Sequence, residues 1–159
     1  MPAGPPLRDV MDSYLGWKKR QDAPRAISAE IFSLCRAPSL AEMKFAESVH
    51  GKNLALLDWV NPAAARGLAA GGKPAFEVGS AIVKQKLLGG GDQAKVVALG
   101  LMVKRQAGFD PDHGDWEFGY WEETPGLMAG AEIASSCGGC HKASPTDFVF
   151  VDASWRIER

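Results

Sequence analysis

The residues with the clearest chemical potential form the segment Cys137-Gly138-Gly139-Cys140-His141. Two thiols three positions apart, followed directly by a histidine, form the C-x-x-C-H signature that attaches haem of the c type. Each thiol can add across one vinyl group of the porphyrin, and the imidazole of His141 then lies under the iron as its proximal ligand. The spacing therefore predicts haem c bound covalently through Cys137 and Cys140, with His141 as the metal ligand.

Two other uses of paired cysteines fit this sequence less well. A thioredoxin-like C-x-x-C gives no role to the following histidine and lies early in a βαβ pattern, which this chain lacks. A structural zinc site needs two further ligands at paired spacing, and Cys35, His50 and His113 do not supply them. Cys35 is expected to be a small buried core residue. We expect a backbone hydrogen bond for His50 and a solvated position for His113.

The sequence offers no obvious second ligand for the iron. No methionine follows His141, and Met11, Met43, Met102 and Met128 precede it. Methionine is more often a core residue than an iron ligand. An open distal position is therefore predicted, and it favours chemistry on a small ligand over electron transfer alone.

Composition and charge limit the class of protein. The chain has 159 residues, 46% of them hydrophobic and 23% charged, with a net charge of −1. These values are typical of one globular domain, so residues 1–159 are expected to form a single haem-binding domain. The net charge gives no general attraction to nucleic acid or anionic lipid, and no segment approaches the roughly 18 apolar residues of a membrane helix. We expect neither nucleic acid nor a membrane as a partner.

The haem motif also predicts where the protein works. Attachment of haem c takes place outside the reducing cytoplasm, so a periplasmic location is expected. The N-terminal segment 1–6 has no basic stretch and no apolar core. We therefore expect that a signal peptide is missing from this sequence.

The elements that must position the motif follow from hydrophobic patterning. Apolar residues at helical spacing predict a helix over 7–20, in which the basic residues 18–20 suit the C-terminal end. The following segments are predicted as strand, short helix, three strands and a helix that leads into the haem motif: 54–60, 63–70, 79–87, 95–104, 116–122 and 127–136. The fold class is α+β, mostly antiparallel β-sheet with flanking helices.

Several segments occur in a characteristic order: Gly79–Lys84, Val103–Arg105 with Gly108–Trp116, the C-x-x-C-H motif, and Asp147–Phe150. In this order they resemble the cytochrome P-460 family and its cytochrome c′-beta relatives over about residues 30–151. The resemblance implies a mostly antiparallel sheet with flanking helices and a C-terminal haem, commonly in a homodimer. It also implies a five-coordinate iron that binds nitric oxide or oxidises hydroxylamine.

The resemblance gives Lys84 a candidate role in cofactor binding and catalysis. Lys84 falls where cytochrome P-460 members have the lysine whose amine is linked to the porphyrin edge. Strand alternation places Ile82, Lys84 and Lys86 on one face. Without the family resemblance, lysines in this pattern are more typical of a solvated surface. Lys86 and Lys73 are the nearest alternatives.

Acidic residues near this lysine differ from the family pattern. Hydroxylamine-oxidising members can carry a distal carboxylate that could accept a proton, and Gly100 falls about where that acid would be. Asp58 is the only charged residue in the strand 54–60. Because a buried acid without a partner is costly, we expect Asp58 to face solvent or a hydrogen-bond donor.

Aromatic residues supply the remaining candidates for the distal pocket. Relatives without the cross-linking lysine use aromatic caps that exclude water and select uncharged ligands such as nitric oxide. Phe32, Trp59 and Phe76 are the candidates for this role. Trp116, Phe118 and Tyr120 alternate along one strand, for which core packing is an adequate explanation.

Three hypotheses follow. The first is a periplasmic mono-haem c protein that oxidises hydroxylamine to nitrogen oxides, binds nitric oxide, or does both, and passes electrons to a periplasmic acceptor. The second is a carrier or sensor of the cytochrome c′-beta type that binds nitric oxide or carbon monoxide without turnover. The third is a helical cytochrome c′ for electron transfer, against which the β-patterned residues 79–122 argue.

Overall fold

One antiparallel sheet dominates the structure. The computed structural model describes residues 3–26, 54–70, 75–144 and 146–149. Seven strands pair in the order β1-β3-β4-β5-β6-β7, with β2 also on β3, and every pairing is antiparallel. The strands are β1 (Lys18–Lys19), β2 (Arg25–Ala26), β3 (Leu54–Val60), β4 (Ala81–Leu88), β5 (Lys95–Lys104), β6 (Trp116–Glu122) and β7 (Gly126–Ala129).

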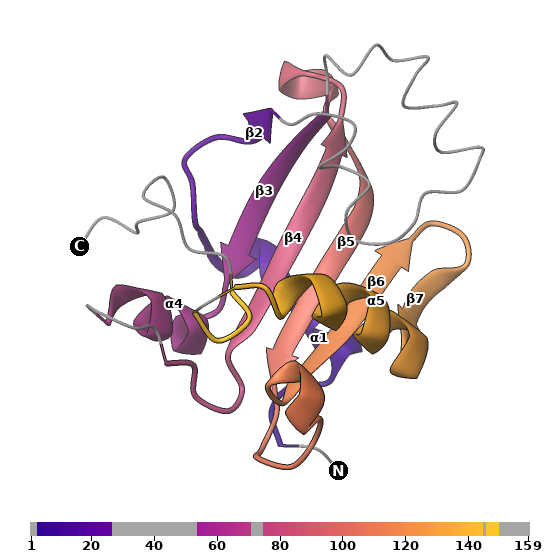
Figure 1. Ribbon diagram of the computed structural model, residues 1–159. Helices are drawn as coiled ribbons and strands as arrows, with labels where there is room; N and C mark the ends of the chain where they lie inside the picture. Colours follow the sequence, from indigo (N-terminus) through magenta and orange to yellow (C-terminus); the bar gives the residue numbers. More distant parts are fainter. Residues whose placement is uncertain (1–2, 27–53, 71–74, 145, 150–159) are drawn as a thin grey trace.

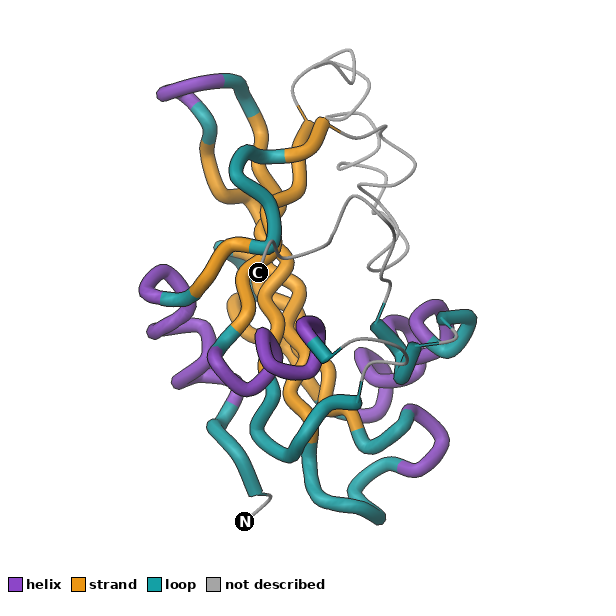
Figure 2. The backbone as a smooth tube through the Cα atoms, turned by 90° about the vertical axis from the view of Figure 1, so that its left-hand side faces the viewer, coloured by secondary structure: helices purple, strands orange, loops and turns teal. Residues whose placement is uncertain are grey.

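Helices lie on both sides of this sheet (Figures 1 and 2). The α-helices are α1 (Leu7–Ser13), α4 (Pro62–Ala69) and α5 (Ala131–His141), and 3-10 turns occupy Tyr14–Gly16, Gly91–Gln93 and Pro111–His113. Helix α5 crosses the front of the sheet in Figure 1, whereas α1 lies behind it. The predicted α+β fold, with a mostly antiparallel sheet, is confirmed.

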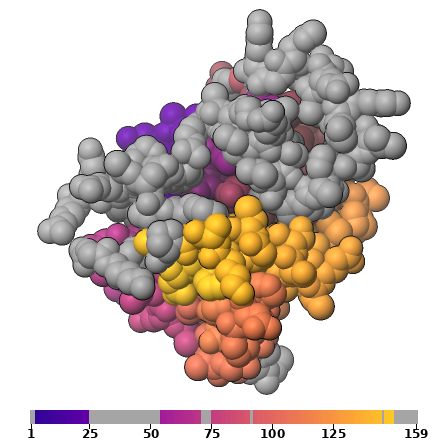
Figure 3. All heavy atoms as spheres, in the orientation of Figure 1, coloured from indigo at the N-terminus to yellow at the C-terminus, as the bar shows by residue number. Residues whose placement is uncertain are grey.

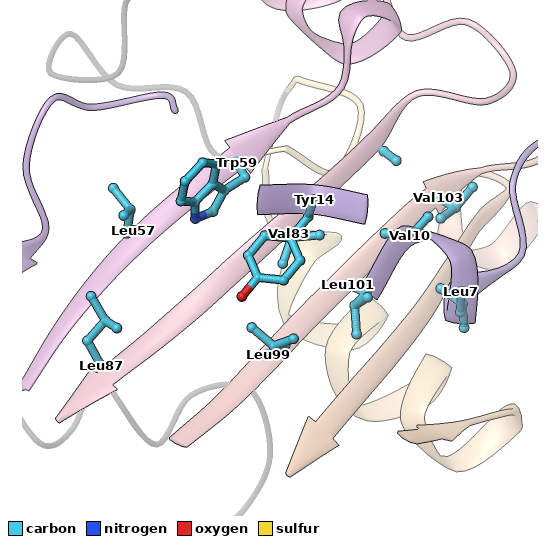
Figure 4. Packing of buried hydrophobic residues seen from close by; sticks show 11 residues of the cluster. Leu7, Val10, Tyr14, Leu57, Trp59, Val83, Leu87, Leu99, Leu101 and Val103 are labelled. Atoms are coloured by element: carbon cyan, nitrogen blue, oxygen red, sulfur yellow. The ribbon is translucent and has the colours of Figure 1, made fainter. Parts of the chain in front are cut away.

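The side of the sheet that α1 covers, which we call the α1 face, carries a cluster of buried hydrophobic side chains at its centre (Figure 4). Alternate strand residues point to this side and pack against the helix. The buried cluster consists of Leu7, Val10, Tyr14, Leu57, Trp59, Ala81, Val83, Leu87, Leu99, Leu101 and Val103. Of the buried hydrophobic clusters in the described residues, this one is the largest.

The opposite side, the α5 face, combines a smaller apolar cluster with charged residues. The cluster joins strand residues to α4 and α5: Val60, Ala64, Phe76, Ile82, Met102, Trp116, Phe118, Cys137 and Val149. Strand alternation also places Asp58, Lys84 and Lys86 on this face. Of these, Asp58 is 3% exposed and Lys86 2% exposed.

The sequence analysis predicted the strands well and the two outer helices less well. β5 and β6 have the predicted bounds, and α4 begins after Asn61, whose side chain accepts a hydrogen bond from the amide of Ala64. The predicted helix 127–136 was misplaced. Residues 127–129 belong to β7, and α5 starts at Ala131 and contains the haem motif itself.

The predicted helix 7–20 is also too long. α1 ends at Ser13, and after a 3-10 turn the backbone becomes extended at Trp17. Lys18 and Lys19 then pair with the end of β3. The extended backbone brings Arg20 to Asp58, and both side chains are buried there. For residues 18–20, backbone pairing with β3 and this ion pair stabilise the extended conformation more than the helical spacing of apolar residues favours a longer helix.

No helix within the described ranges has the length and apolar character that a bilayer span requires.

Candidate haem site

The predicted haem-attaching residues lie on one helix. Cys137, Cys140 and His141 occupy the last turns of α5, so both thiols and the imidazole are presented from consecutive turns. Cys137 is buried within the α5-face cluster, whereas Cys140 is exposed, and both thiols are free. This donor set suits a haem that bridges from the helix to the sheet.

One ring nitrogen of His141 has a fixed partner. Nδ1 lies 2.7 Å from the backbone oxygen of Phe148. A carbonyl oxygen can only accept, so Nδ1 carries the proton and Nε2 keeps its lone pair. Metal-ligating histidines ordinarily use this arrangement, in which the second nitrogen donates to a backbone carbonyl. Its ring also packs beside Phe118, with 5.5 Å between ring centroids.

The protonation state of His141 fits the same role. Burial is the main cause that lowers the pKa of His141, and the positive charge of Lys84 lowers it too. The hydrogen bond to Phe148 acts in the opposite direction, and the resulting pKa is about 4. The imidazole is therefore neutral at pH 7, which is the form that binds iron.

A row of polar residues crosses the α5 face beside this helix. Cross-strand pairing puts Asp58 next to Lys84, Lys84 next to Gly100, and Gly100 next to Tyr120. Arg20 extends the row at the other end, through a backbone hydrogen bond to Asp58. We call these five residues the polar row. Since glycine has no side chain, nothing on β5 separates Lys84 from Tyr120 within it.

The sequence analysis expected Asp58 to face solvent or a hydrogen-bond donor. In the structure its carboxylate faces the guanidinium group of Arg20. The two side chains are 5% and 3% exposed, with 3.6 Å between Oδ2 and the Arg20 Nη1. Sequence reasoning placed Arg20 at a solvated helix end and so missed the partner. The presence of an acid, Asp58, in an otherwise apolar strand could have pointed to this partner, because a buried carboxylate requires a cation nearby.

The two lysines of β4 on this face have different surroundings. Lys86 is almost fully buried, and its Nζ lies 3.4 Å from the hydroxyl of Tyr120 and 5.2 Å from the ring centroid. Lys84 is half-buried, and its charge acts on His141. Of the two, Lys84 is thus the one whose field reaches the predicted iron ligand. The third candidate, Lys73, lies outside the described residues.

The three aromatic candidates for the distal pocket do not lie together in the structure. Trp59 lies on the α1 face, 5.7 Å from the Tyr14 ring centroid, and its Nε1 donates to Gln85. Because Asp58 faces α5, its neighbour Trp59 must face α1, on the side of the sheet opposite Cys137 and His141. Phe76 is buried in the same cluster as Cys137, and Phe32 lies outside the described residues.

His113 has a role that sequence reasoning missed. It was expected to be solvated, but its side chain is 21% exposed and its Nδ1 lies 2.7 Å from Oδ2 of Asp110. The ring packs directly on Gly138, where a Cβ atom would lie 2.3 Å from the His113 Cδ2. Figure 3 shows the turn that contains His113 against the last turns of α5. Gly138 is therefore required by close packing. Cys35 and His50 lie outside the described residues.

The alternative of a metal site built from protein side chains alone has no support in the described part of the chain. Within residues 3–26, 54–70, 75–144 and 146–149, no group of three or more His, Cys, Asp or Glu side chains could hold a metal ion. A single neutral imidazole with two adjacent thiols instead fits a porphyrin-bound iron.

Comparison with protein families decides the class. A sequence model of the family described as Cytochrome P460 matches residues 58–151, from the buried acid of β3 to beyond the haem motif. The chain belongs to the cytochrome P460 family. It is accordingly a haem c protein, and the matched region contains Lys84, Gly100 and the whole of α5. A search of curated proteins found no match.

Proposed function

We propose that this cytochrome P460 protein binds its haem between α5 and the polar row, through Cys137, Cys140 and His141. The observation that carries the proposal is that the His141 ring packs beside Phe118 on the α5 face, the face that also carries Lys84, whose charge lowers the pKa of His141. They come from β4 and the end of α5, and the sheet brings them to the same face. When bound, the haem would supply an iron, held by His141, that could bind a small ligand.

The proposed ligand is hydroxylamine or nitric oxide. The polar row presents the side-chain nitrogen of Lys84, which keeps an N–H when bonded to the porphyrin, and the hydroxyl group of Tyr120. Both can donate hydrogen bonds to a nitrogen or oxygen atom of a small ligand. The apolar side chains of Ile82, Met102 and Phe118 adjoin the row and restrict the access of water.

For Lys84 we propose a bond from its Nζ to the porphyrin edge. Such a bond replaces one N–H and one porphyrin C–H, so its formation removes two electrons and two protons. It therefore requires an oxidant, for which a peroxide is the appropriate chemical class. The buried Lys86 is the control position, because its ammonium group already lies against Tyr120.

Oxidation of hydroxylamine also requires a proton acceptor. On the strands of the α5 face in the described residues, carboxylates occur at Asp58 and Glu122. Asp58 is held by Arg20, and Glu122 lies one pair away from the polar row. Gly100, beside Lys84, provides no acid. This difference favours the second candidate function, a carrier or sensor that binds nitric oxide or carbon monoxide without turnover.

An intact mass and the optical spectrum of the reduced holoprotein test the lysine bond. We expect a Soret band displaced from that of ordinary haem c, and its return to the ordinary position in Lys84→Ala. Lys86→Ala is expected to leave the displacement in place. An ordinary band in the wild type that Lys84→Ala does not alter would contradict the bond.

Turnover then separates the enzyme from the binder. Hydroxylamine is supplied with an artificial electron acceptor, and reduction of the acceptor is followed for the wild type and for Gly100→Glu. If the missing acid limits the reaction, Gly100→Glu oxidises hydroxylamine faster than the wild type by about tenfold or more, as expected for a positioned general base. Wild-type turnover that Gly100→Glu does not raise would show that another group accepts the proton.

We further propose a periplasmic location, an electron acceptor in the same compartment and a homodimeric state. The support is the haem attachment chemistry, which requires an oxidising compartment, and the family. Fractionation of cells and light scattering of the holoprotein test the location and the oligomeric state.

A further inference from the structure

We propose that Lys104 and Asp147 are positioning residues for the iron ligand, acting through the backbone carbonyl of Phe148. This inference rests on the proposed role of His141. The pair joins the end of β5 to the turn that follows α5, 43 positions apart in the sequence. Neither residue is itself expected to touch the haem.

The pair is well connected. Lys104 Nζ donates to both carboxylate oxygens of Asp147 and to the backbone oxygen of Gly114, each at 2.8 Å. The two side chains are 16% and 25% exposed. Lys104 also lies over the ring of Trp116, 5.2 Å from its centroid. Three acceptors and a partly buried position make this a stronger contact than an exposed ion pair.

The turn that the pair holds has an unfavourable backbone. Asp147 and Phe148 have φ angles of 49° and 64°, in the left-handed region that non-glycine residues rarely adopt. Trp116 Nε1 donates to the backbone oxygen of Asp147 at 2.9 Å, and the Phe148 ring fills the space beside Gly114. Strain of this kind persists only where the surroundings impose it.

The result of this conformation is the direction of one carbonyl group. The Phe148 oxygen lies 2.7 Å from Nδ1 of His141. A strong hydrogen bond at Nδ1 fixes the ring orientation and raises the basicity of Nε2, the atom left for iron. Loss of the contact between Lys104 and Asp147 is therefore expected to weaken the bond between His141 and iron.

The test uses the holoprotein and the variants Lys104→Met and Asp147→Asn. The matched control is Lys95→Met, because Lys95 also belongs to β5 but pairs with Glu123 at an exposed site, 73% and 86% exposed. We measure the iron–histidine stretching frequency of the reduced protein by resonance Raman spectroscopy, and the reduction potential. In both variants the frequency is expected to fall and the potential to rise. Lys104→Arg, which keeps a donor, and Lys95→Met are expected to leave both near the wild-type values.

The possible failures are distinguishable. An iron–histidine band that stays unchanged in Asp147→Asn, or that moves equally in Lys95→Met, overturns the role of the pair. Absence of that band in the wild type overturns the proposed role of His141 instead. Asp147→Asn keeps the size of the side chain, so it decides the matter even if Lys104→Met does not fold.

Discussion

The two faces of the sheet are built from alternate residues of the same strands, yet they differ in chemistry. On β4, Val83 points to the α1 face and is fully buried among apolar side chains. Its neighbour Lys84 points to the α5 face, where its charge reaches His141. The comparison teaches that one strand can serve the core and the site at once, because successive side chains alternate between the faces.

Polar groups on the two faces are used differently. At the centre of the α1 face the buried polar groups are neutral: Trp59 Nε1 donates to Gln85, and Gln85 donates to the Tyr14 hydroxyl. These three residues are neutral and satisfy one another. A buried charge, Arg105 with its partner Glu117, lies only at the edge of this face among the described residues.

The α5 face buries the pair of Asp58 and Arg20 in its polar row, beside Lys84. Strongly perturbed ionisable groups are concentrated at functional sites, and on the α5 face His141 is such a group. We therefore assign the chemistry to the α5 face and mainly stability to the α1 face.

The largest expected effect is on haem content. Replacement of both Cys137 and Cys140 by serine, made in the Lys84→Ala background so that the proposed lysine bond cannot retain the porphyrin, removes the two thiols that can attach it. We expect complete loss of covalent haem, measured as the pyridine haemochrome of the denatured chain after extraction with acidic acetone. Each single serine variant is expected to keep one thioether link. Retention of covalent haem in the double variant is possible only through another residue, and would contradict the assignment of the two thiols.

The next effect concerns the buried ion pair of the α5 face. Asp58→Ala removes the carboxylate that lies beside the buried Arg20 guanidinium, and we expect a loss of about 3–5 kcal/mol in the free energy of unfolding. The control is Glu77→Ala, which removes the partner of Arg66 from an exposed pair; we expect about 0–1 kcal/mol there. Urea unfolding of the holoproteins measures both. Equal losses of unfolding free energy in Asp58→Ala and Glu77→Ala would show that the buried ion pair stabilises the protein no more than the exposed one.

A substitution in the apolar core of the α1 face is expected to lower the stability of the protein without changing the haem site. Leu101 is 1% exposed, so Leu101→Ala is expected to cost about 2–5 kcal/mol through lost burial and the cavity left behind. The optical spectrum of the reduced holoprotein should not change. A shifted Soret band in this variant would show that the two faces are coupled.

The smallest effect is expected at Tyr14. Tyr14→Phe leaves the Gln85 donor without its acceptor, at a cost of about 1–3 kcal/mol. Burial raises the pKa of Tyr14 above its usual value of 10, against the hydrogen bond from Gln85. The unfolded chain thus ionises first, and the contribution of Tyr14 to stability is present below pH 10 and lost as the pH rises through the higher folded-state pKa. Unfolding curves between pH 8 and about 11 should fall more steeply for the wild type than for Tyr14→Phe; parallel curves would contradict this role.

Sequence patterns predicted the features of the molecule that depend on residues close together in the chain. The alternation in 95–104 and 116–122, and the turn residues between strands, gave the bounds of β5 and β6. The C-x-x-C-H spacing was enough to predict the candidate ligands, because it is a chemical requirement within a few residues. Only the family resemblance pointed to Lys84, since the strand pattern alone favoured a solvated lysine.

The remaining features depend on contacts that no local pattern encodes. Arg20 leaves the helical pattern because β3 offers it backbone pairing and a buried carboxylate. The strand pattern alone did not decide which face of the sheet Trp59 occupies, because an aromatic residue in an apolar strand suits either side. The carbonyl of Phe148 reaches His141 only through the turn that Lys104 holds. Such pairings become visible once the sheet sets the register.

The most direct test of the central claim, that the α5 face is the haem face, is to identify the haem-bearing peptides of the holoprotein after digestion with trypsin. Cleavage after lysine and arginine yields the peptide 106–142, which contains both thiols and His141. We predict haem on this peptide through Cys137 and Cys140, joined through the same porphyrin to the peptide 67–86 at Lys84. Unmodified cysteines in the peptide 106–142 would contradict the account.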